Sequence, residues 1–245
     1  MEKQINKKLS IGILLPIMII SLLVMIFEGY FRKPIHYIPF VIFGSVIILF
    51  DFYVVCFQMS TKRLLSLIPV AGTTGYITQM VGTGSDIWVY TNEGKTFFVA
   101  IFMFIFVAIA MYGLTAKMLT LPVPPVIKTN RKWLFATCWI VFLFAFLVIT
   151  SQRFKQTITL WFWVYYSLLF VFALYSSFKF TGRKIICITI AAWIIGLASE
   201  YLGSQAGIWL FANNNVPPAF LVVGAWPLEF TFHYCFSAMI VNEMS

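Results

Sequence analysis

The chain repeats itself at an offset of 121 residues, with no gap. Identical residues that coincide at this offset include Ala71 and Ala192, Gly75 and Gly196, Gly82 and Gly203, Ile87 and Ile208, Trp88 and Trp209, and Asn92 and Asn213. One aligned pair differs in chemistry, because Gln79 stands opposite Glu200. The repeat predicts two copies of one structural unit that carry unequal polar groups.

The composition indicates which solvent these units fold in. Apolar residues make up 61% of the chain and charged residues 10%, against roughly 45–50% and 25% in soluble domains. A helix that crosses the bilayer core of about 30 Å needs about 20 mostly apolar residues. Such windows lie near 10–30, 36–59, 64–84, 97–117, 133–150, 158–180, 185–205 and 218–241. We therefore expect an all-α polytopic membrane protein with about eight transmembrane helices.

The spacing of these windows predicts the domain organisation. Adding 121 to the first four windows gives approximately the last four, so we expect two tandem, parallel four-helix repeats at 1–117 and 133–245. The stretch 118–132 contains three prolines between basic residues, which is typical of an extended linker.

The net charge of +9 is unevenly distributed around the windows. Twelve of the 17 lysines and arginines fall on the side that holds both termini and the linker. By the positive-inside rule that side is cytoplasmic, so we expect a multi-pass protein of the cell membrane with both termini and the linker in the cytoplasm. Because orientation accounts for the excess charge, no nucleic-acid partner is indicated.

Ionisable residues inside the windows are the candidates for function, since a charge near the bilayer centre costs about 2.5–3.5 kcal/mol even on insertion scales. Asp51 lies past the middle of its window with no cation nearby. Glu200 and Gln79 each continue a stripe of small residues at every fourth position, which also fits a packing seam between helices.

The last window holds the densest polar group. Glu229 and His233 are four residues apart, so they share a helix face, and Pro227 removes a backbone hydrogen bond beside them. Apolar surroundings disfavour the charged form of a carboxylic acid, and a general acid has to hold a proton. A structural Glu–His pair that links helices is the alternative. Only two histidines occur in the chain and no metal motif is present, so no metal site is expected.

The segments Gly207 to Phe211 and Trp226 to Phe232 together resemble a signature of the lycopene cyclases that occur as paired small membrane domains, in two subunits or fused in one chain. That family has a Gly-x-Trp-x-Phe/Tyr segment before a helix that opens with Pro, an aliphatic residue and two acids. Here Pro227, Leu228 and Glu229 match, Phe230 takes the place of the second acid, and the first copy has no Pro-x-Glu at the 121-residue offset.

The resemblance implies a lycopene β-cyclase-like isomerase of carotenoid biosynthesis that acts on a long isoprenoid. Glu229 would donate the proton, Glu200 or Asp51 would be its partner or the later base, and His233 would orient or recharge Glu229. No cofactor is expected, because the net reaction is an isomerisation.

Aromatic faces would stabilise the carbocation. We expect the substrate-binding wall to consist of Trp88, Trp209, Trp226, Gln79 and Phe230. Trp88 and Trp209 also lie where an outer aromatic belt would place them.

A second class of function stays open. A non-enzymatic membrane protein or a transporter could bind a lipid or small hydrophobic ligand at the interface of two repeats. In both cases the expected partners are the bilayer and an isoprenoid or lipid, with a homo- or hetero-oligomer possible.

Overall fold

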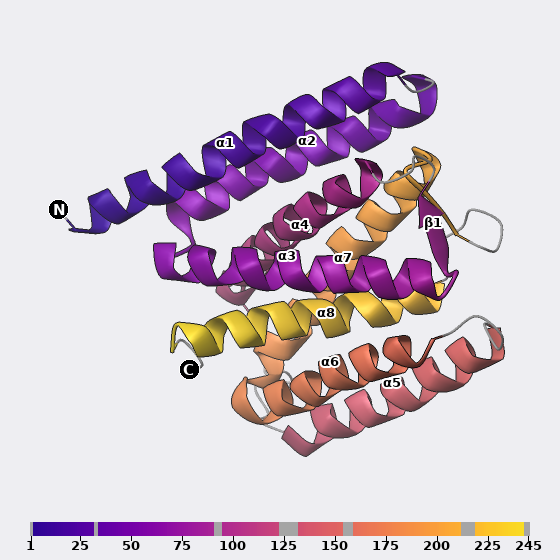
Figure 1. Cartoon of the computed structure of the whole chain (residues 1–245). Coiled ribbons are helices and arrows are strands. Elements are labelled where there is room, and N and C mark those ends of the chain that lie inside the picture. The colour runs from indigo at the N-terminus through magenta and orange to yellow at the C-terminus, as the bar shows by residue number, and fades with distance from the viewer. Residues whose placement is uncertain are drawn as a thin grey trace.

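The structure is a computed structural model that describes residues 2–31, 34–90, 95–122, 132–153, 159–211 and 219–242. This part of the chain forms eight helices and two short strands (Figure 1). In chain order they are α1 (Glu2–Phe31), α2 (Pro34–Phe57), α3 (Thr61–Gly84), β1 (Trp88–Tyr90), α4 (Lys95–Thr120), α5 (Lys132–Arg153), α6 (Leu160–Lys179), α7 (Gly182–Gln205), β2 (Trp209–Phe211) and α8 (Ala219–Ile240).

The described residues are almost all helical, as expected, and several of the helices are apolar enough to suggest a membrane protein. Each apolar window coincides with one helix, and five segments are long and apolar enough to cross a bilayer. These are Tyr37–Phe57, Thr61–Gly84, Ile101–Thr120, Leu160–Lys179 and Gly182–Gln205. Large apolar side chains on the outside of the bundle, such as Leu49, Phe144 and Trp161, are about 70% exposed, as expected of a surface that faces lipid.

The helices form a central group with a pair on each side. Figure 1 shows α3, α4, α7 and α8 between the α1–α2 pair and the α5–α6 pair. Within the centre, α3 packs on α4 and α8, and α7 packs on the same two helices. Both termini lie at one end of the bundle and β1 lies at the other (Figure 1). Helix α4 continues to Thr120, three residues into the range expected as linker, and residues 123–131 of that range lie outside the described residues.

The ends of α3 and α7 have the same local structure at positions 121 apart. Ile87 N donates to Gly82 O at 3.0 Å, and Ile208 N donates to Gly203 O at the same distance. The residue before each isoleucine has a positive φ, of 50° and 66°. This turn reverses the chain after each helix and leads it into a strand.

The two strands pair with each other at the end of the bundle opposite the termini, and so link its two halves. They are antiparallel, and Trp88 lies opposite Phe211, Val89 opposite Leu210, and Tyr90 opposite Trp209. The central pair, Val89 and Leu210, is itself 121 residues apart. Two units related by a two-fold rotation would place their strands in this way.

Two glycines let the tryptophan rings lie directly on the helices. A Cβ atom at Gly82 would lie 1.9 Å from Trp88 Cζ2, and one at Gly203 would lie 2.3 Å from the Trp209 ring. Any larger residue would have to displace the ring. The repeated glycine and tryptophan therefore form one packing unit, which occurs once in each half.

At the end that holds the termini, a buried arginine ties α3 to α8. Arg63 Nη2 donates to Tyr234 O at 2.5 Å, and the guanidinium lies over the rings of Tyr112 and Tyr234 at 5.4 and 4.8 Å. Cation–π contact of this kind is favourable when the cation is desolvated. Ser66 Oγ adds a hydrogen bond to Ser237 O at 3.2 Å.

Candidate functional site

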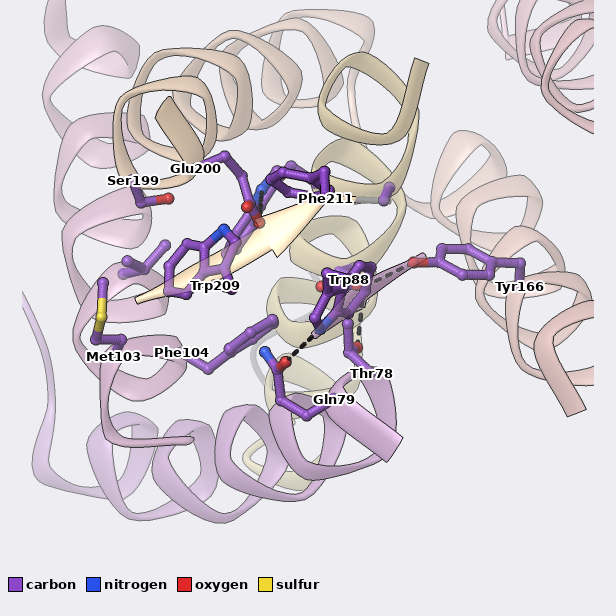
Figure 2. Close-up of a pocket in the computed structure, with 14 residues that line it drawn as sticks. Thr78, Gln79, Trp88, Met103, Phe104, Tyr166, Ser199, Glu200, Trp209 and Phe211 are labelled. Carbon is purple, nitrogen blue, oxygen red and sulfur yellow. Dashed lines mark hydrogen bonds between the residues drawn. The ribbon is translucent and has the colours of Figure 1, made fainter. Parts of the chain in front are cut away.

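A pocket lies among α3, α4, α7 and α8, next to the strand pair (Figure 2). The space between its side chains, with the open mouth included, is about 650 Å³. The first half of the chain contributes Thr78, Gln79, Trp88, Met103, Phe104 and Val107. The second half contributes Tyr166, Ser199, Glu200, Trp209, Phe211, Ala225, Trp226 and Glu229.

Equivalent positions of the repeat line the pocket from both halves. The lining pairs 121 residues apart are Thr78 and Ser199, Gln79 and Glu200, Trp88 and Trp209, and Phe104 and Ala225. Figure 2 shows Gln79 and Glu200 on opposite sides of the pocket. Among these four lining pairs, Gln79 and Glu200 combine an amide with a carboxylic acid, so the two walls of the pocket are unequal.

Glu229 is held by hydroxyl groups from two other helices. Its Oε1 accepts from Thr78 Oγ1 at 3.0 Å and from Tyr166 Oη at 3.3 Å. Only 2% of Glu229 is exposed. When the carboxyl is protonated, an oxygen that accepts two hydrogen bonds is the carbonyl oxygen, so the proton is on Oε2.

A third hydroxyl extends this network. Thr78 Oγ1 lies 2.8 Å from Tyr165 Oη. A threonine hydroxyl has one hydrogen, and Thr78 donates it to Glu229, so Tyr165 is the donor to Thr78. Helices α3, α6 and α8 therefore fix the position of the Glu229 carboxyl.

Glu200 has tryptophan neighbours. Its Oε1 accepts from Trp226 Nε1 at 3.2 Å, and Figure 2 shows the Trp209 ring beside the Glu200 side chain. Trp226 stacks on Phe104 with ring centroids 5.1 Å apart. The Trp226 ring also lies on Gly196, where a Cβ atom would be 2.4 Å from Cγ of the indole. The small-residue stripe on α7 thus makes room for a pocket side chain.

Gln79 is the counterpart of Glu200 on the opposite wall. Its Oε1 accepts from Trp88 Nε1 at 3.0 Å and from the hydroxyl of Tyr90. Burial raises the pKa of the Tyr90 hydroxyl, in β1, above its usual range, and the Coulombic effect of Glu200 raises it further. Tyr90 therefore keeps its proton and acts as a donor.

Six of the residues expected to form the site line this pocket together. They are Glu229, Glu200, Trp226, Trp209, Trp88 and Gln79. Helix packing brings them together from α3, α7, α8 and the two strands.

Three expected site residues are not among the lining residues. His233 is buried one turn from Glu229, and its Nε2 forms a hydrogen bond with Thr74 Oγ1. Asp51 is fully buried in α2, and neither carboxyl oxygen has a hydrogen-bond partner within the described residues. Phe230 is fully buried and packs edge-on against Tyr234 at 6.1 Å.

The hydroxyl groups around Glu229 were not foreseen from the sequence. Tyr165 and Tyr166 are adjacent hydroxyl-bearing residues near the middle of a largely apolar window, and this pair is a usable signal. Thr78 precedes Gln79 and aligns with Ser199, so the repeat also pointed to it. No pattern in the sequence predicted which helices pack together, and this packing is what brings the hydroxyls to Glu229.

In the described part of the chain, no cluster of three or more histidine, cysteine or carboxylate side chains could hold a metal ion. Comparisons with models of protein families, with curated proteins and with solved structures found no match.

Proposed function

We propose that this protein is a membrane-embedded, cofactor-independent isomerase that cyclises the end of a long isoprenoid by acid catalysis, in the manner of a lycopene cyclase. The observation that carries the proposal is the convergence of Glu229, Glu200 and three tryptophans on one pocket within apolar helices. Two carboxyl groups in a largely apolar pocket are what proton transfer to and from a hydrocarbon requires.

The reaction needs one proton donor and one proton acceptor. The Oε2 proton of Glu229 adds to a carbon–carbon double bond and leaves a carbocation on the neighbouring carbon. A second double bond attacks this cation and closes the ring. A C–H beside the new cation then loses its proton to Glu200, so no atoms are gained or lost. Glu200 then releases this proton to solvent and Glu229 takes up another from solvent, which completes the cycle.

The walls of the pocket suit a carbocation. Trp88, Trp209 and Trp226 line it, and an indole face attracts a cation within about 6 Å of its centroid. Apolar lining residues such as Met103 and Val107 reduce the access of water, which would otherwise add to the cation.

We also propose that all eight helices span the membrane as two parallel four-helix repeats, with both termini in the cytoplasm. Equivalent helices make equivalent contacts, because α2 packs on α4 as α6 packs on α8, and α3 packs on α8 as α7 packs on α4. The antiparallel strand pair supports a two-fold relation between the repeats. The pocket then lies at the interface of the repeats.

Expression of the protein in bacteria that accumulate lycopene tests the activity. We expect the pigment extract to shift from lycopene to cyclised carotenoids, measured by absorbance and chromatography. Lycopene that stays unchanged while the protein is present in the membrane contradicts an enzyme of this class. A lipid that co-purifies with such an inactive protein would favour a binding protein instead.

A further inference from the structure

The Gln79 amide has a defined orientation. Trp88 Nε1 lies 3.0 Å from a terminal atom of the Gln79 side chain. An indole N–H is a donor only, so this atom has to be the amide oxygen. Tyr90 donates to the same oxygen. Both hydrogen bonds together fix the oxygen against β1 and leave the amide nitrogen on the other side of the group.

The Gln79 nitrogen is therefore a spare donor at the pocket. Figure 2 shows Nε2 directed away from Trp88, on the side of Phe104. Gln79 lines the pocket and is only 6% exposed, and Nε2 has no hydrogen bond to another described residue. A ligand without an acceptor would bury this N–H without a partner, which costs about 1–3 kcal/mol. An acceptor on a bound ligand would remove that cost.

Most other donors of the pocket already have acceptors; the exception is Trp209 Nε1, beside Glu200, which has no hydrogen-bond partner among the described residues. The hydroxyls of Thr78 and Tyr166 donate to Glu229, and the indole nitrogens of Trp88 and Trp226 donate to Gln79 and Glu200. Among these five polar side chains, the Gln79 amide alone presents an N–H with no acceptor. It does so on the wall opposite Glu200 (Figure 2).

We propose that the pocket selects an isoprenoid whose end group carries an oxygen acceptor, an ether, hydroxyl or carbonyl oxygen, and that Gln79 Nε2 donates to this oxygen. The proposal rests on the proposed function, because it names the substrate class of the same site. A pure hydrocarbon such as lycopene would enter the pocket and leave the Gln79 donor unpaired. An oxygenated end group would pair it and would be held in one orientation.

A matched pair of ligands tests the proposal on the whole protein in lipid nanodiscs. The probes are a linear C20 isoprenoid hydrocarbon and its terminal methyl ether, which has an acceptor but no donor. Binding is measured by the change in tryptophan fluorescence, since Trp88, Trp209 and Trp226 line the pocket. We expect the ether to bind about fivefold to tenfold more tightly, the effect of one net hydrogen bond. Equal affinities in the unmodified protein overturn the proposal.

The variant Gln79→Met assigns the preference to one residue. Methionine keeps the length of the side chain and a weak acceptor for Trp88 and Tyr90, but it has no N–H. We expect the affinity for the hydrocarbon to stay within about twofold and the preference for the ether to disappear. The control Gln205→Met makes the same change at the exposed end of α7 and should keep the preference. A preference for the ether that survives in Gln79→Met overturns the assignment.

The failures of the two proposals are distinguishable. A protein that prefers the ether and never cyclises any isoprenoid contradicts the proposed function and leaves the role of Gln79 intact. A protein that cyclises lycopene and binds both probes equally contradicts the role of Gln79 alone. If Gln79→Met fails to fold, the comparison of the two probes in the unmodified protein still decides.

Discussion

Replacement of Glu229 by glutamine should slow cyclisation by about 10²–10⁴-fold, the usual contribution of a general acid. Glutamine retains a carbonyl oxygen that accepts from Thr78 and Tyr166, so the network around residue 229 is kept. What it removes is the transferable proton on Oε2. The rate is measured as cyclised product formed per amount of membrane protein.

The control for this variant is Asp86→Asn, which makes the same acid-to-amide change at an exposed turn after α3. Asparagine tolerates the positive φ of position 86, so neither folding nor rate should change. A Glu229→Gln protein that cyclises as fast as the Asp86→Asn protein excludes Glu229 as the acid.

The second large effect is expected from Gly82→Ala. The added methyl carbon would lie 1.9 Å from Trp88 Cζ2, so the indole has to move, and overpacking of this kind costs about 1–3 kcal/mol. Because Trp88 lines the pocket and donates to Gln79, its displacement should also weaken ligand binding. Thermal unfolding in detergent and tryptophan fluorescence measure the two effects.

Gly84→Ala is the matched control, two residues later in the same helix. A Cβ atom at Gly84 meets nothing within 4 Å. Alanine is a better helix former than glycine by about 1 kcal/mol, so this variant should be as stable as the parent or more so. Equal melting temperatures for the two variants would contradict the close contact between Gly82 and Trp88.

The sequence predicted the helices well because the bilayer leaves few alternatives. A span has to satisfy its own backbone hydrogen bonds over about 20 apolar residues, so hydropathy located seven of the eight described helices to within about three residues at each end. Helix α1 is the exception, because it begins at Glu2, eight residues before the expected window. The aligned glycines and tryptophans of the repeat were also informative. They proved to be one contact, Gly82 with Trp88 and Gly203 with Trp209, formed within each half.

The site was predictable only in part, since contacts between helices distant in sequence depend on packing. Glu229, Glu200 and Gln79 could be picked out as polar residues in apolar windows, and they line one pocket. His233 has the helical spacing to meet Glu229, yet its Nε2 bonds to Thr74 on α3. The hydrogen-bond partner of a polar side chain in a helix bundle depends on which helix packs beside it as much as on the residue spacing along its own helix.

The most direct test of the central claim is to run the reaction in deuterium oxide. If Glu229 donates a solvent-exchangeable proton to carbon and Glu200 removes a different one, each ring closed should add one deuterium on carbon. Mass spectrometry of the purified carotenoid then shows a product one mass unit heavier per ring than the product made in ordinary water. Cyclised product with no added deuterium would contradict acid catalysis by this pocket.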